Sequence, residues 1–220
     1  MIVTIGQSLD LSTEDLCLAE ITALLHDIGR FEQFKRYKTF SDYKSEDHAA
    51  LGVQVIESNR LLHSSAPEKT GIIIHAVRYH NHLTLPGDLT DRCLFFLKLL
   101  RDADKIDIWH VVTDYYENIM ENRNQDIELG LPDEPHISMP VYHALMSGRL
   151  VRMSDLKTLN DFKLLQMGWI YDINFPKTFQ IIGKKGYLEK IRKALPQSSI
   201  HAEEIYTRIK KYLEGKIHTV

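Results

Sequence analysis

The spacing of apolar positions predicts helices along most of the chain. Near the N-terminus, Leu16, Ala19 and Ala23 recur at the interval that places them on one helical face. Ser12 precedes them as a candidate N-cap, and acidic residues in the first turn favour the positive end of the helix dipole. We expect this helix to stop near Gly29, because glycine readily adopts the left-handed conformation that ends many helices.

The stretch that follows, residues 30–44, is polar and rich in aromatic residues, and its apolar positions have no clean period. We expect a loop or short turns there. Further helices are predicted near residues 45–56, 67–80, 90–112, 141–147, 156–171, 187–195 and 200–214. The only β-leaning piece is the short segment 179–182, so the predicted fold class is all-α.

The length of 220 residues fits one large domain, or a domain with a dependent lobe. Residues 122–140 are irregular and polar, and they mark the best boundary. We therefore expect a helical core over residues 1–121. Residues 122–220 would form a C-terminal helical lobe that packs on this core and is not an independent domain.

Composition and charge narrow the classes of partner. The chain has 27 Lys and Arg against 30 Asp and Glu, a formal net charge of −3. This balance gives no general attraction to a nucleic acid polymer or to an anionic membrane. The N-terminus lacks a signal-peptide pattern, and the most apolar segment, residues 93–100, is too short to span a bilayer. We expect a cytoplasmic protein with no nucleic acid polymer and no membrane as partner.

Four histidine- and aspartate-bearing motifs carry the candidate chemistry. His26 and Asp27 are adjacent in LLHDIGR, at the C-terminal end of a predicted helix, where the partial negative charge favours a cation. Imidazole and carboxylate together suit a divalent transition metal or magnesium. His48 follows in EDHAALG and His80 in RYHN. Asp104 lies within a long apolar helix, where a carboxylate is costly unless it is paired or bound to metal.

The order of these motifs resembles the HD-domain superfamily of metal-dependent phosphohydrolases. The HD pair is followed by H-x-x-x-G from His48 to Gly52, by a histidine that ends a helix, and by Ala-Asp-Lys at residues 103–105. The resemblance covers roughly residues 10–115. It implies an HD-domain-like helical bundle and a divalent metal cofactor, with one or two ions of Mn, Mg, Fe, Co, Ni or Zn.

The resemblance also implies roles for individual residues. It assigns a catalytic metal to His26, Asp27 and Asp104, and a second metal or substrate contact to His48 and His80. The expected reaction is hydrolysis of a phosphoester by a metal-activated water. Asp27 would orient or deprotonate the water, and His48 or His80 would protonate the leaving group.

Basic residues near these motifs are candidates for phosphate binding. Lys105 follows the metal-binding aspartate directly, and the cluster of Arg30, Arg36 and Lys38 follows the HD helix. Aromatic residues are interleaved with this cluster. We expect these aromatic side chains to anchor the loop; the alternative is that they stack on the nucleobase of a ligand.

One departure from the family pattern leaves two alternatives open. The family's first histidine lies on the helix before the HD helix, whereas this sequence has no histidine before His26. Either a helix precedes Met1, of which residues 1–5 would be the last turns, or the domain binds metal weakly. The second alternative favours a regulatory domain that senses nucleotide or metal. The expected partner is a small phosphorylated substrate such as a nucleotide, and the sequence is also compatible with a homodimer.

Overall fold

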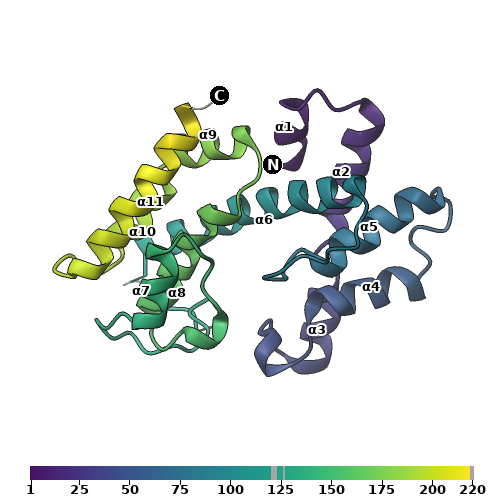
Figure 1. The fold of residues 1–220 in the computed structure, drawn as a ribbon. Helices are drawn as coiled ribbons and strands as arrows, with labels where there is room; N and C mark the ends of the chain where they lie inside the picture. The colour runs from purple at the N-terminus through teal and green to yellow at the C-terminus, as the bar shows by residue number, and fades with distance from the viewer. Residues whose placement is uncertain (120–122, 126, 219–220) are drawn as a thin grey trace. The chain divides into compact units, whose positions relative to one another are not determined.

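The structure is a computed structural model that describes residues 1–119, 123–125 and 127–218. Over these ranges the chain forms only α-helices and short 3-10 turns, with no strand, so the all-α prediction is confirmed (Figure 1). None of the described helices is long and apolar enough to cross a membrane. The chain divides into two compact units, Met1–Asp104 and Lys105–Val220.

The first unit contains five helices, a 3-10 turn and the first part of a long sixth helix. Its elements are α1 (Ile2–Gln7), α2 (Thr13–Leu25), α3 (Gly29–Tyr37), η1 (Asp42–Lys44), α4 (His48–Ser58), α5 (Pro67–Tyr79) and the start of α6 (Asp91–Glu117). Ser12 caps α2 by accepting a hydrogen bond from the backbone N–H of Asp15, as predicted. Leu18, Leu51, Ile72 and Leu97 are buried and contribute to the core of this unit.

Gly29 has a different role from the predicted one. Gly29 does not adopt the left-handed conformation that would end a helix; it is the first residue of α3. This helix occupies the first part of residues 30–44, for which the sequence predicts a loop or short turns. A Cβ atom at Gly29 would overlap the carbonyl oxygen of His48 and the backbone nitrogen of Gly52. The glycine is therefore required by the close approach of α3 and α4. Gly29 does not end α2, and α3 begins at this residue.

The second unit is also helical. It comprises the remainder of α6, then α7 (Met139–Met146), η2 (Met153–Asp155), α8 (Leu159–Gly168), η3 (Trp169–Asp172), α9 (Pro176–Lys185), α10 (Tyr187–Lys193) and α11 (Ile200–His218). The segment 179–182, predicted to lean towards β structure, lies inside α9. Phe179 and Ile182 are both buried there, at helical spacing, after a proline in the first turn.

The division between the units falls within α6, whereas the predicted boundary lay at residues 121 and 122, which are outside the described residues. The C-terminal part of α6 packs with the later helices. The Trp109 ring donates its Nε1–H to the carbonyl of Gln166 at 3.0 Å and stacks on Tyr187. The hydrophobic pattern of α6 continues without a break across residues 104 and 105, so the sequence does not mark the boundary between the two units.

Candidate metal centre

The end of α2 fixes the first histidine. His26 is the C-cap residue of α2, and its Nδ1 lies 2.7 Å from the carbonyl oxygen of Ala23. Because a carbonyl only accepts hydrogen bonds, Nδ1 carries the proton and the neutral ring keeps its lone pair on Nε2. That Nε2 lies 3.5 Å from Oδ1 of Asp104 and 3.8 Å from Oδ2 of Asp27.

The end of α5 uses the same arrangement. His80 is the C-cap residue of α5, and its Nδ1 lies 2.8 Å from the carbonyl oxygen of Val77. The ring is buried and approaches the ring of His26 edge to face, with 5.2 Å between their centroids. The last turn of each helix thus holds one imidazole with Nε2 available as a ligand.

His48 begins α4 and is oriented by a carboxylate. Its Nδ1 lies 2.8 Å from Oδ2 of Asp42, and its Nε2 lies 3.0 Å from Nε2 of His80. Asp42 in η1 is itself held by the side-chain amide of Gln33 at 2.8 Å. Sequence reasoning missed Asp42, because no pattern marks a carboxylate six residues before the histidine that it contacts.

Asp27 supplies a buried oxygen that lacks a hydrogen-bond partner. Its Oδ1 lies 3.2 Å from Nε2 of His48 and 3.8 Å from Nε2 of His80, yet it is buried without a hydrogen bond of acceptable geometry. The side chain as a whole is 46% exposed, so one carboxylate oxygen points inwards and the other remains accessible. An orphaned carboxylate oxygen among imidazole nitrogens is what a divalent cation would satisfy.

Potential ligand atoms of His26, Asp27 and His80 lie within 4.8 Å of one another. A second group, Asp42, Asp47 and His48, meets the same criterion. Its acidic members are already engaged, because Asp42 holds His48 and Asp47 caps α4 through the N–H of Ala49. The first group is therefore the better metal site.

The ionisation of the cluster indicates excess negative charge. Burial alone lowers the pKa of His26, but its hydrogen bond with Asp104 and the charges of Asp104 and Asp27 outweigh this and raise the pKa to about 9. Burial would raise the pKa of Asp27, but His48, His26 and Arg30 hold it below its ordinary value. Burial, reinforced by the other two histidines, lowers the pKa of His80 to about 4. In the absence of a metal, His26 is protonated near neutral pH, and its positive charge partly balances the negative charge of Asp27 and Asp104.

The sequence of residues 1–109 matches the family model of the HD domain. The chain carries an HD domain. No curated protein and no solved structure was found to match the chain. HD domains are generally metal-dependent phosphohydrolases that bind divalent metals, in agreement with the convergence of histidine and aspartate side chains in this unit. The resemblance carried by the four sequence motifs is thereby confirmed.

A buried arginine stabilises the HD domain beside His80. The Nη1 atom of Arg101 donates to the carbonyl oxygens of His80 at 2.7 Å and His82 at 2.6 Å, and approaches that of Tyr79 at 3.3 Å. The carbonyls of His80 and His82 lie at the C-cap of α5 and just beyond it, where a helix leaves acceptors without intrahelical partners. Arg101 therefore fixes the turn that positions His80. Sequence reasoning gave it no such role, although it lies only three residues before Asp104.

The predicted phosphate-binding residues differ in their surroundings. Arg30 joins the cluster, because its Nε lies 3.5 Å from Oδ1 of Asp27 and its Nη1 lies 3.4 Å from Oδ1 of Asp42. Arg36 is held at the surface by carboxylates of Glu32 at 2.7 Å and Glu46 at 3.4 Å. Its guanidinium is therefore engaged outside the cluster, and a phosphate role for it stays a prediction.

The two predicted lysines are also engaged elsewhere. The ammonium group of Lys38 lies 5.7 Å from the centre of the Phe34 ring. Lys105 is buried, and its ammonium lies 2.7 Å from Oδ2 of Asp172 in the second unit. Adjacency to Asp104 in the sequence does not bring both side chains to one point, because consecutive helical residues point about 100° apart. Phosphate binding by Lys105 and Lys38 stays a prediction.

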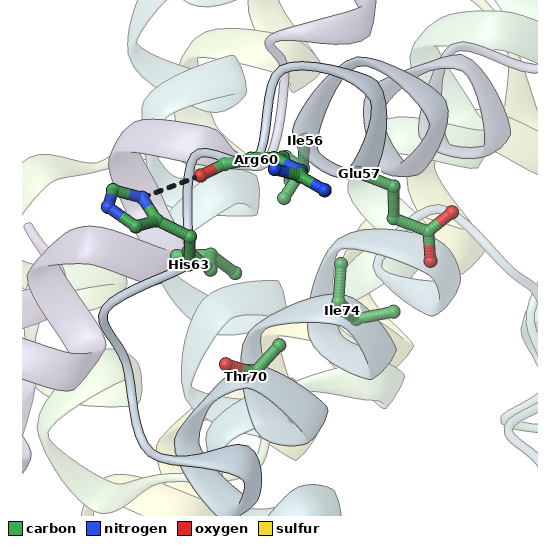
Figure 2. Close-up of a pocket in the computed structure, with 7 residues that line it drawn as sticks. Ile56, Glu57, Arg60, His63, Thr70 and Ile74 are labelled. Carbon is green, nitrogen blue, oxygen red and sulfur yellow. Dashed lines mark hydrogen bonds between the residues drawn. The ribbon is translucent and has the colours of Figure 1, made fainter.

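A separate pocket lies at the opposite end of α4 and α5 (Figure 2). It has a volume of about 320 Å³ and is lined by Ile56, Glu57, Arg60, Leu62, His63, Thr70 and Ile74. The imidazole of His63 is turned to the carbonyl of Arg60 at 3.0 Å. His48 starts α4 and His80 follows α5, whereas this pocket is built from the end of α4 and the start of α5. The pocket contains none of the predicted site residues.

Proposed function

We propose that the protein hydrolyses a phosphoester of a nucleotide or a small phosphorylated metabolite. The observation that carries this proposal is the convergence of three Nε2 atoms on the carboxylate of Asp27, those of His48 and His80 near its buried Oδ1 and that of His26 near its Oδ2. Each Nδ1 is engaged by a carbonyl or carboxylate, so each neutral ring would present its lone pair to a cation. Asp104 adds a carboxylate beside His26.

In the proposed site His26, Asp27, His48, His80 and Asp104 hold the divalent metal. The metal, when bound, would polarise a phosphoryl oxygen and lower the pKa of a water molecule. The accessible oxygen of Asp27 would orient that water. Its low pKa keeps Asp27 ionised near neutral pH, as this role requires, and makes it a weak acceptor for the proton of the water.

Arg30 is the cation best placed to offset charge on the phosphoryl oxygens. Its guanidinium lies beside both Asp27 and Asp42 and is part-exposed, so a phosphate could share it with these carboxylates. The donor to the leaving group was expected to be His48 or His80. Burial keeps His80 neutral near pH 7, which makes it a poor proton donor. His48 would donate a proton only in a state in which its Nε2 does not hold the metal.

The test is a phosphate-release screen over nucleotides and small phosphoesters with Mn, Mg, Fe, Co, Ni and Zn. The His26→Ala and Asp27→Ala variants should lose metal-dependent release and bound metal, measured by elemental analysis. His63→Ala is the matched control, since His63 lies in the pocket at the other end of α4 and α5. Full metal-dependent release by either site variant would show that the assignment is wrong.

The same screen addresses the alternative of a sensing domain. Nucleotide binding without phosphate release under any of these metals would favour a regulatory role over hydrolysis. The metal content of the purified protein gives an independent readout. Metal bound by the wild type and absent from His26→Ala would support the site even if no substrate in the screen were cleaved.

A further inference from the structure

Helix α3 buries a polar amide at a position where packing favours an apolar side chain. Its buried residues are Gly29 and Gln33, which lie one turn apart, whereas Phe31 and Phe34 of the same helix are exposed. Gln33 is fully buried, with 0% of its surface exposed. Burying an amide costs free energy unless its polar atoms are hydrogen-bonded. A sequence that breaks the apolar pattern of a packed face in this way indicates a role beyond packing.

The amide nitrogen of Gln33 faces three acceptors in the segment that precedes α4. Its Nε2 lies 2.8 Å from Oδ1 of Asp42, 3.0 Å from Oγ of Ser45 and 2.9 Å from the carbonyl oxygen of Glu46. The hydroxyl of Ser45 donates to the carbonyl of Ser41 at 2.8 Å, so its oxygen has a lone pair to offer. The opposite orientation of the amide would place Oε1 against the same three oxygens. The partners of Gln33 therefore determine that Nε2 faces this segment.

Asp42 depends on these contacts for its orientation. Its side chain is 37% exposed in the short turn η1, so packing alone does not hold its rotamer. Oδ1 accepts from Nε2 of Gln33 at 2.8 Å, and Nη1 of Arg30 lies 3.4 Å from the same oxygen. Nδ1 of His48 lies 2.9 Å from Oδ1 and 2.8 Å from Oδ2. The carboxylate thus lies between a buried amide and the imidazole that it orients.

We propose that Gln33 is a positioning residue of the metal centre. It holds the carboxylate of Asp42 in the rotamer that accepts the Nδ1–H of His48, and this keeps Nε2 of His48 directed at the centre. This inference rests on the proposed function, which makes His48 a metal ligand. Gln33 acts through Asp42 and is not itself assigned to the metal. A glutamine that only fastened residues 42–46 to α3 would affect stability without affecting His48.

The test observes the Nδ1–H group of His48 by heteronuclear NMR in the full chain, without metal and in EDTA. A buried ring N–H that donates to a carboxylate exchanges slowly with water, and its absence from His48→Gln identifies the resonance. Gln33→Met keeps the length and the helix preference of the side chain but removes both amide hydrogens. We expect the resonance to shift and its exchange rate to rise about fivefold, the change produced by the loss of one net hydrogen bond.

Metal affinity gives a second readout. Calorimetry with Mn or Zn should show an affinity about tenfold lower in Gln33→Met, at the lower end of the loss caused by removing an outer partner of a metal ligand. In the Asp42→Asn background the same change should cause little further loss, because the carboxylate that Gln33 positions has already been replaced. Full addition of the two losses would show that Gln33 acts by another route and would overturn the inference.

Gln166→Met is the matched control. Gln166 is a second glutamine with 0% exposure, and it lies in the second unit, where its Oε1 accepts from the hydroxyl of Tyr116 at 2.8 Å. Its replacement also removes a buried, hydrogen-bonded amide. This variant should leave the His48 resonance and the metal affinity unchanged.

An unchanged His48 resonance in folded Gln33→Met, with unchanged metal affinity, would overturn the inference even if stability falls. If Gln33→Met does not fold, Gln33→Asn, whose amide is shorter by one methylene, should change both readouts in the same direction, and no change there would equally overturn it. The resonance is observed without metal or substrate, so the two proposals fail separately. A changed resonance without phosphate release by the wild type removes the hydrolase alone. Phosphate release by the wild type with an unchanged resonance in Gln33→Met removes this inference alone.

Discussion

The Nε2 atoms of His48 and His80 face each other at 3.0 Å. Two lone pairs at this distance repel, so the pair requires a shared proton or a cation. The neighbouring carboxylates of Asp27 and Asp42 keep the pKa of His48 above its ordinary value despite burial, whereas burial lowers that of His80 to about 4. In the metal-free protein the proton therefore resides on His48, and a divalent metal would replace it.

Asp42→Asn should weaken metal binding while leaving the fold intact. The amide can still contact Nδ1 of His48 but loses the charge that fixes the ring and raises its basicity. We expect a loss of roughly 10- to 100-fold in metal affinity, measured by calorimetry with Mn or Zn. Asp88→Asn, at an exposed residue in the turn after α5, is the control. Unchanged affinity in Asp42→Asn would contradict the role given to this carboxylate.

The metal-free protein should lose stability as pH rises from about 6.5 to 9. The pKa of His26 is raised to about 9 from 6.5, so its contribution is fully present below 6.5 and is lost as pH rises through 9. The free energy of unfolding in urea with EDTA should fall by at most about 2–3 kcal/mol over this range. His26→Gln should flatten the dependence, and an equally steep slope in that variant would exclude His26 as its source.

Metal affinity should increase with pH over the same range, because the metal displaces the proton from His26. One displaced proton changes the apparent affinity about tenfold per pH unit. Competition with a chelator of known affinity, at pH 6.5, 7.5 and 8.5, measures this slope. A pH-independent affinity, after correction for the chelator, would mean that His26 does not release a proton on binding.

Gly29→Ala should destabilise the HD domain. The added methyl group would overlap backbone atoms of His48 and Gly52, which cannot move aside as a flexible side chain would. We expect a loss of at least about 1–3 kcal/mol in the free energy of unfolding and weaker metal binding, because α4 carries His48. Gly71→Ala is the control, since a Cβ atom there meets open space within a helix and should stabilise by up to about 1 kcal/mol. Equal stabilities of the two variants would refute the close approach.

The Lys105→Met variant distinguishes a structural role of Lys105, as the ion-pair partner of Asp172, from a role in binding phosphate. As the partner of Asp172 it is structural, and removing it deprives a part-buried carboxylate of this ion pair at a cost of about 1–3 kcal/mol. Asp172→Asn should then cause a similar loss, and a double-mutant cycle should show coupling. If Lys105 binds phosphate, Lys105→Met alone should raise KM at a temperature where every variant is folded.

The local features of this protein could be predicted from the sequence. Helical periodicity, the Ser12 cap and the order of the HD, H-x-x-x-G and A-D-K motifs depend on residues that are neighbours in the chain. They were sufficient for the all-α class and for the five proposed metal ligands. Gly29 is the exception among local signals, because a glycine that ends a helix and one that allows close packing look the same in sequence.

Only the tertiary structure decided how the site is completed. The pairing of Asp42 with His48, the hold of Arg101 on the end of α5 and the partner of Lys105 join residues from different elements. Ring orientation is decided in the same way, since the contact of each Nδ1 determines which nitrogen is free. Sequence alone determined which ligand types are present. Packing between helices determined where their lone pairs point, because that depends on distances that no local pattern encodes.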